Sequence, residues 1–139
     1  MQGLAAKGLN LNTELPESPA ICIIAVKPQM MGDALPRLQA LGGGATVFLS
    51  IAAGTTIAAF ERVFGADARI IRAMPNTPAA VAHGITALIG NANASDRDMA
   101  LAAALLRAIG QTVRLDDESQ MDAVTAVSGS GPAYVFHLI

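Results

Sequence analysis

Residues 128–134, Ser-Gly-Ser-Gly-Pro-Ala-Tyr, form the stretch of this sequence with the clearest chemical potential. Two serine hydroxyls lie beside two glycines, which allow unusual backbone dihedral angles and the close approach of a ligand. Proline is favoured in the first turn of a helix, so Pro132 predicts a helix start whose free N–H groups can bind an anion. The stretch therefore predicts a polar, anion-binding pocket. The alternative is an ordinary turn between two helices.

Three other short segments place small or polar residues directly after predicted strands. They are residues 25–28 (AVKP), 50–54 (SIAAG) and 72–78 (RAMPNTP). Ligands of open α/β sheets bind in the crevice beyond the carboxyl ends of the strands. Any one of these segments alone is typical of an ordinary strand-to-helix turn. Because three of them converge on one edge, they predict a nucleotide-binding crevice.

The elements that must position these residues follow from hydrophobic patterning. Continuous apolar runs predict strands of the kind that is buried on both faces of a parallel sheet over residues 20–26 and 46–51. Further strands are predicted over residues 69–74, 84–89 and 112–115. Helical spacing predicts helices within residues 30–38, 57–64, 95–109 and 119–127. This alternation indicates an α/β fold: a partial Rossmann-like, doubly wound, mostly parallel sheet with right-handed crossovers, ending in the start of an α-helical domain.

Local signals fix several helix ends. Thr55 or Thr56 can cap the helix of residues 57–64, and Ser95 followed by Asp98 is typical of a capping box. Asp117 or Ser119 can start the helix that leads to residue 128. The acidic run of residues 116–118 predicts a solvated turn with a favourable acidic helix start.

Composition excludes several classes of protein. The 139 residues are 53% hydrophobic and 14% charged, which excludes a disordered chain, and a net charge of -2 offers no footprint for nucleic acid. No apolar run reaches the length of a membrane span, and no group of Cys, His and carboxylates has metal-ligand spacing. Cys22, the single cysteine, lies in an apolar run and predicts a small buried side chain in a reducing, cytoplasmic environment.

The last five residues, Val-Phe-His-Leu-Ile, form an apolar helical stretch without a stop signal. We therefore expect the chain to be a piece of a longer protein. Residues 1–117 would form a partial dinucleotide-binding domain, and residues 118–139 the start of a helical substrate and dimerisation domain. An exposed apolar helix would seek a partner, which predicts a homo-oligomer.

Residues 122–134 together resemble the signature of the pyrroline-5-carboxylate reductase family, which catalyses the last step of proline synthesis. The segments AVKP, SIAAG and RAMPNTP resemble three further blocks of that family, in the same order. The resemblance covers nearly the whole chain from about residue 12 onward. It implies reduction of 1-pyrroline-5-carboxylate to L-proline by hydride transfer from NADPH, with NADH as the other candidate.

The resemblance also implies roles for individual residues. The implied cofactor-binding residues are Asn12, Ala25, Val26, Lys27, Pro28, Ile51, Ala52, Ala53, Pro75 and Asn76. Ser128, Ser130 and Gly131 are implied to bind the substrate, and Ser130 and His137 to take part in catalysis. His137 falls where some relatives carry a threonine hydroxyl that meets the imine nitrogen; packing at an interface is the alternative role. No metal is implied, and hydride transfer depends more on alignment than on a strong base.

Part of the family pattern is missing. The G-x-G-x-x-G phosphate fingerprint is absent, and Gly42-Gly43-Gly44 follows a helix and precedes a strand, the reverse of the required context. In the family, that fingerprint lies on an upstream strand–helix–strand unit. The chain therefore resembles the middle of the enzyme.

Two other functions remain open at this point. One is a related β-hydroxyacid-type dehydrogenase, which would need a catalytic lysine on the helix after the sheet, whereas no lysine follows Lys27. The other is a non-catalytic truncated module that folds or oligomerises without turnover.

Overall fold

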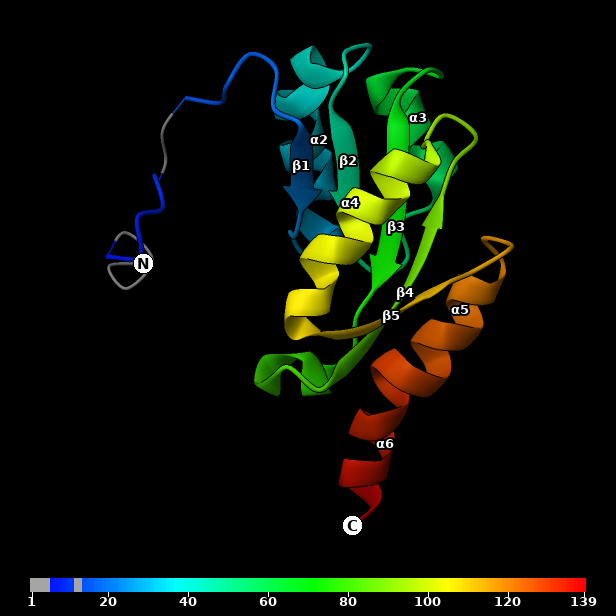
Figure 1. The fold of residues 1–139 in the computed structure, drawn as a ribbon. Helices are drawn as coiled ribbons and strands as arrows, with labels where there is room; N and C mark the ends of the chain where they lie inside the picture. Colours follow the sequence, from blue (N-terminus) through cyan, green and yellow to red (C-terminus); the bar gives the residue numbers. More distant parts are fainter. Residues whose placement is uncertain (1–5, 12–13) are drawn as a thin grey trace.

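A computed structural model describes residues 6–11 and 14–139 of the chain. It is a five-stranded sheet with helices on both faces (Figure 1). The strands are β1 (Ile21–Ile24), β2 (Val47–Ser50), β3 (Arg69–Met74), β4 (Gly84–Gly90) and β5 (Gly110–Arg114), in the spatial order β1-β2-β3-β4-β5. The α-helices are α2 (Met31–Leu38), α3 (Ile57–Phe64), α4 (Asp96–Leu106), α5 (Gln120–Val124) and α6 (Gly131–Leu138).

The first three strands run parallel, whereas β4 is antiparallel to β3 and β5 is parallel to β4. The α/β class and the mostly parallel sheet are confirmed. β4 is the one antiparallel neighbour in the mostly parallel order, because no crossover helix precedes it. Residues 75–83 contain two prolines and a short 3₁₀ helix (Thr77–Val81), which is too short to return the chain to the opposite edge.

Each face of the sheet has its own core. Phe48, Ile70 and Ala87 point toward α2 and α3, where the Phe48 and Phe64 rings stack with centroids 3.9 Å apart. Leu49 and Ile71 point to the other face, where α4 covers them (Figure 1). The strict alternation along β2 and β3 explains why both strands are continuously apolar: both of their faces are covered.

The prediction that the first strand is buried on both faces is wrong. β1 lies at the edge of the sheet, and Ile23 is 53% exposed. Cys22 is half-buried and packs against the core under α2 and α3. Burial raises the pKa of its thiol above the ordinary value, so the group is neutral near pH 7.

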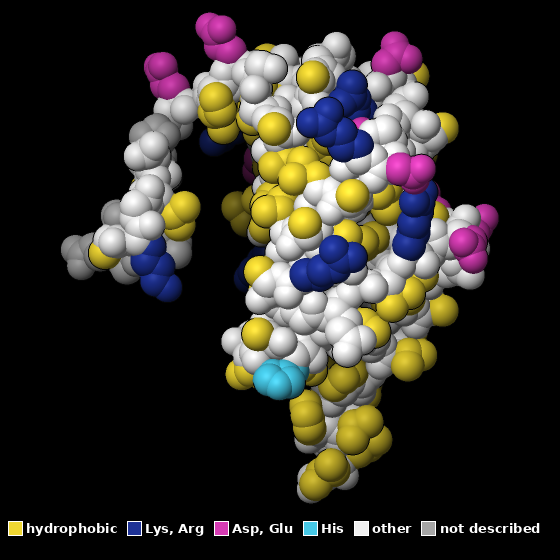
Figure 2. Space-filling view, in the orientation of Figure 1, with side chains coloured by type: hydrophobic (Ala, Val, Ile, Leu, Met, Phe, Trp, Pro, Cys, Tyr) yellow, Lys and Arg dark blue, Asp and Glu magenta, His cyan; other side chains and the backbone are white. Residues whose placement is uncertain are grey.

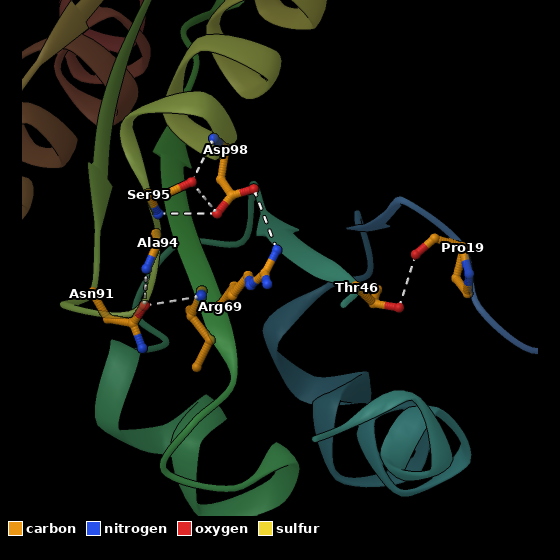
Figure 3. Close-up of polar contacts among 8 residues, drawn as sticks. Pro19, Thr46, Arg69, Asn91, Ala94, Ser95 and Asp98 are labelled. Carbon is orange, nitrogen blue, oxygen red and sulfur yellow. Dashed lines mark hydrogen bonds and ion pairs between the residues drawn. The ribbon is translucent and has the colours of Figure 1, made fainter. Parts of the chain in front are cut away.

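The predicted caps occur at α3 and α4. Thr56 Oγ1 accepts a hydrogen bond from the Ala59 N–H at 3.3 Å. Ser95 and Asp98 form a reciprocal capping box at the start of α4: Ser95 Oγ accepts from the Asp98 N–H at 3.2 Å, and Asp98 Oδ2 accepts from the Ser95 N–H at 2.9 Å (Figure 3). Local sequence therefore determines where both helices begin.

None of the helices that the structure describes is long and apolar enough to cross a lipid bilayer.

Candidate functional site

The carboxyl ends of β1, β2 and β3 meet at one edge of the sheet. Ile24 lies opposite Ser50, and Ser50 opposite Arg72, so the three strands end nearly level. The Ile51 N–H donates to the Ile24 carbonyl at 3.1 Å, which fixes the turn after β2 against the end of β1. Three of the four segments singled out from the sequence therefore do share one edge.

The turn after β2 is held from inside the protein. Ser50 is 1% exposed, and its Oγ accepts a hydrogen bond from the Ala52 N–H at 3.3 Å. Ala52 is buried in the core, whereas Ile51 and Ala53 are half-buried. Gly54 completes the turn at φ +72°, a conformation that favours glycine. Residues 51–54 therefore form a rigid turn of small residues at the end of β2.

The turn after β1 is more open. Ala25, Lys27 and Pro28 are exposed, and Val26 packs partly against the core. The Lys27 carbonyl accepts from the Met30 N–H at 2.8 Å and so starts the 3₁₀ helix Pro28–Met30. The Lys27 ammonium thus adds positive charge near the edge where β1, β2 and β3 end.

Asn76 connects this edge to the helical C-terminal segment. It follows β3 directly after Pro75, and both residues are half-buried. Asn76 Oδ1 accepts from the Ile85 N–H at 2.9 Å, and Asn76 Nδ2 donates to Ser128 Oγ at 3.1 Å. One side chain therefore joins β3, β4 and the serine-glycine segment.

The serine-glycine segment is helical, so the predicted turn is wrong, whereas the predicted place of Pro132 in the first turn of a helix is confirmed at α6. Residues of the π-helix Thr125–Ser130 link α5 to α6, and Ser130 and Gly131 both have right-handed helical dihedral angles. Proline lacks an N–H, and its ring would clash with the Ser128 carbonyl in a regular α-helix. The wider turns of the π-helix just before Pro132 relieve this conflict, and such turns are frequent at functional sites.

The glycines of this segment permit close approach rather than unusual dihedral angles. A Cβ at Gly129 would lie 2.4 Å from Met74 Cε at the end of β3. A Cβ at Gly131 would lie 3.0 Å from the Ala126 carbonyl oxygen. The helical segment therefore rests directly on the end of β3, with Ser128 half-buried beside it.

The remaining predicted site residues are more exposed. Ser130 is exposed, Gly131 is half-buried, and His137 lies exposed on α6, which extends past the carboxyl ends of β1–β3 (Figure 1). Among the described residues, neither the Ser130 hydroxyl nor the His137 ring makes a hydrogen bond to protein, so both are free to face a ligand. Asn12 lies outside the described residues.

An apolar groove of about 390 Å³ runs beside Ser128. Side chains of β4, β5 and the α5–π-helix segment form its walls, with Ser128 as the one polar residue. The wall residues are Ile85, Ala87, Val113, Leu115, Ala123, Val124, Val127 and Ser128.

Sequence reasoning missed Glu118, which it assigned to a solvated turn. Glu118 Oε1 accepts from the Ile57 N–H at 2.8 Å and also from the guanidinium of Arg72, which is 5% exposed. The carboxylate thus links the start of α3, the end of β3 and the segment leading to α5. Arg72 lies in a predicted strand, and a buried guanidinium needs a carboxylate partner. This requirement is the signal from which the role of Glu118 could have been predicted.

A second polar cluster, with a structural role, lies at the opposite end of the strands, where β3 begins (Figure 3). Arg69 lies 3.7 Å from Asp98, and Asn91 Oδ1 accepts from the N–H groups of Ile70 and Ala94. These contacts join the start of β3 to the loop before α4. Within the described residues, no group of three or more His, Cys, Asp or Glu is placed to hold a metal ion.

Comparison with known proteins agrees with this arrangement. A family model described as "Pyrroline-5-carboxylate reductase dimerisation" matches residues 118–139. The chain is 41% identical over 119 residues to pyrroline-5-carboxylate reductase of Haemophilus influenzae, covering 86% of the chain and 44% of that relative. The chain spans about half the length of the curated relatives it matches.

Solved structures give the same picture. A pyrroline-5-carboxylate reductase from Coxiella burnetii matches with a TM-score of 0.80 and 35% identity, over 86% of this chain and 44% of that one. The Plasmodium falciparum enzyme, solved with NADP bound, matches with a TM-score of 0.78 and 31% identity, over 86% of this chain and 45% of that one. Together with the four sequence blocks in order, these matches show that the chain belongs to the pyrroline-5-carboxylate reductase family.

Proposed function

We propose that the protein to which this chain belongs reduces 1-pyrroline-5-carboxylate to L-proline by hydride transfer from NADPH, with NADH as the alternative donor. The observation that carries this proposal is the hydrogen bond from Asn76 to Ser128. It joins the edge where three parallel strands end to the helical segment that carries the predicted substrate residues. Cofactor and substrate would therefore meet at this junction.

The residues of the edge fit a dinucleotide. The turns after β1 and β2 carry the small residues Ala25, Ala52, Ala53 and Gly54, and a Cβ at Gly54 would meet no atom within 4 Å, so a ligand can approach the backbone there. Exposed Lys27 supplies a cation for an anionic ligand. When bound, the nicotinamide supplies the hydride. The remaining cofactor contacts would come from Val26, Pro28, Ile51 and Pro75, from the backbone of Asn76, whose side chain bonds Ile85 and Ser128, and from Asn12.

The substrate would lie between this edge and the helical segment. Ser128 and Ser130 offer hydroxyl donors to its carboxylate, and Gly131 permits close approach to the backbone. His137, exposed on α6, would hydrogen-bond the imine nitrogen. Chemistry at the C=N bond then depends on alignment, which matches the scarcity of strong bases at this edge.

Association of two or more copies through α6 completes the proposal. Its apolar side chains are exposed and form the lower end of the surface in Figure 2. The family model that matches residues 118–139 describes a dimerisation region. We place the protein in the cytoplasm because Cys22 is a free thiol, the usual state in a reducing compartment.

Turnover of the natural full-length protein tests this proposal. Consumption of NADPH should depend on 1-pyrroline-5-carboxylate and should yield proline. In a second assay with NADP⁺ as the oxidant, β-hydroxyacids should not be oxidised. A preparation that binds no cofactor and turns over neither substrate would instead favour the non-catalytic module.

A further inference from the structure

The carboxamide of Asn76 has a fixed orientation. The Ile85 N–H can only donate a hydrogen bond, so the atom of Asn76 that faces it at 2.9 Å must be the oxygen. The nitrogen then faces Ser128 Oγ at 3.1 Å and must donate to it, since an amide NH₂ does not accept. The backbone of β4 thus determines which end of Asn76 meets Ser128.

This orientation determines what Ser128 can do. Its oxygen already accepts a hydrogen bond, and its own proton has no acceptor among the described residues. Thr125, one turn earlier, differs: its hydroxyl donates to the Met121 carbonyl at 2.8 Å. Ser128 is half-buried, and it is the one polar residue on the wall of the apolar groove. Its hydroxyl therefore has a fixed position and an unused donor.

We propose that Asn76 is a positioning residue that holds Ser128 as a hydrogen-bond donor toward the carboxylate of the imino-acid substrate. This inference deepens the proposed function and rests on it. A donor locked in place before the substrate arrives loses little entropy on binding. A hydroxyl that was free to rotate would also offer its lone pairs to the substrate carboxylate, which would repel it.

The variant Asn76→Asp tests the inference because it reverses one hydrogen bond and keeps the other. The new carboxylate still accepts from the Ile85 N–H, but it presents an acceptor to Ser128, whose hydroxyl must then donate to it. We expect kcat/KM for 1-pyrroline-5-carboxylate to fall roughly 10- to 100-fold, the effect of losing a hydrogen bond to a charged group. KM for NADPH should change less than about threefold by the same reasoning.

Two controls separate this role from a structural one. The first is 1-pyrroline, which has the same ring without the carboxylate: Asn76→Asp should leave its kcat/KM within about threefold of wild type, because no carboxylate contact is lost. The second is the Ser128→Ala background, in which adding Asn76→Asp should cost less than about threefold, because the residue it acts through is gone. A new negative charge acting directly on the cofactor would persist in both controls.

The outcomes are distinct. Equal losses with both substrates, an undiminished loss in the Ser128→Ala background, or wild-type kinetics of Asn76→Asp would each overturn the positioning role while leaving the reductase proposal intact. A wild-type protein without turnover of 1-pyrroline-5-carboxylate would remove both. If Asn76→Asp does not fold, Asn76→Ala serves: it frees Ser128 without reversing the bond, so its loss should be smaller, confined to the carboxylated substrate and absent in the Ser128→Ala background.

Discussion

At the residue scale, a buried arginine and its carboxylate partner hold distant parts of the molecule together. Arg72 lies in the middle of the sheet at 5% exposure, and its partner Glu118 comes from a segment 46 positions later. The same carboxylate accepts the first N–H of α3, at Ile57. A single acidic side chain therefore satisfies two buried donors.

Replacing Glu118 with alanine should lower the free energy of unfolding by about 2–3 kcal/mol. The change leaves the Arg72 guanidinium buried without a counter-charge, although the partial exposure of Glu118 keeps the loss below that of a fully buried pair. Urea unfolding monitored by circular dichroism measures the change. The exposed Glu17→Ala is the matched control, and a loss equal to that of the control would contradict this role.

The lowered pKa of the Asp98 carboxyl makes the stability of the fold depend on pH in acid. Burial raises the pKa of its carboxyl, but hydrogen bonds from Ser95 and the charges of Arg69 and Arg97 outweigh burial and leave the pKa below the ordinary 3.8. A carboxyl with a lowered pKa stabilises the folded state above its unfolded pKa. That stabilisation is lost as the pH falls through the folded value.

Asp98→Asn should therefore cost about 1 kcal/mol at pH 7, the usual value of a helix cap, and make stability less dependent on pH below about 4. Thermal melts over the range from about pH 2 to about pH 7 would measure both effects. Asp96→Asn, in an exposed pair with Arg114, should change little. An unaltered acid dependence in Asp98→Asn would show that another carboxyl dominates.

At the element scale, the pairing of β4 with β5 depends on Gly110. Gly84 lies opposite Gly110 in the register, and Gly110 has φ +142°. A Cβ at Gly110 would come within 2.0 Å of the Gly84 carbonyl oxygen. The two backbones can approach because Gly110 has no side chain, whereas a Cβ at Gly84 would instead lie 2.8 Å from Ala79 Cα.

Gly110→Ala should destabilise the fold by roughly 2–5 kcal/mol, through backbone strain and the clash with β4. Gly32→Ala provides a contrast on α2, where a Cβ meets nothing within 4 Å; it should stabilise by about 0.5–1 kcal/mol through helix propensity. Denaturant midpoints of the two variants should move in opposite directions. A neutral Gly110→Ala would contradict the close approach.

Sequence patterns predicted the elements whose causes are local. The buried runs of β2 and β3 and the Thr56 and Ser95 caps follow from periodicity and capping chemistry, and the structure confirms them. The direction of β4 and the edge position of β1 depend on tertiary pairing, which periodicity does not carry. The helical state of residues 128–131 was missed because Gly and Pro signals usually mark turns, whereas here a π-helix accommodates them.

The candidate site was likewise predictable where it depends on local patterns and strand pairing, but not where it depends on contacts between distant residues. The shared edge of the segments after β1, β2 and β3 follows from parallel pairing. The contact between Asn76 and Ser128 spans 52 positions, and the role of Glu118 spans 46 and 61, so neither had a local signal.

At the scale of the whole molecule, the exposed apolar surface of α6 predicts self-association. Tyr134, Phe136 and Leu138 are 71%, 75% and 84% exposed, so α6 leaves large apolar side chains uncovered around its surface. Phe136→Asp should raise the dissociation constant of the oligomer at least about tenfold, the effect of about 1.4 kcal/mol. Sedimentation velocity would measure it, with Glu17→Asp, an exposed position before β1, as a neutral control. An unchanged oligomer would place the interface elsewhere.

The central claim is that the edge where β1, β2 and β3 end holds the dinucleotide, and an NADPH titration of the natural full-length protein and two variants tests it most directly. Ala53→Glu places a carboxylate on the turn after β2. Ala66→Glu places one on the exposed loop between α3 and β3, at the opposite end of the strands. We expect saturable binding by wild type and Ala66→Glu, and affinity at least about tenfold weaker for Ala53→Glu. Equal NADPH affinity of all three proteins, or no binding by wild type, would contradict the claim.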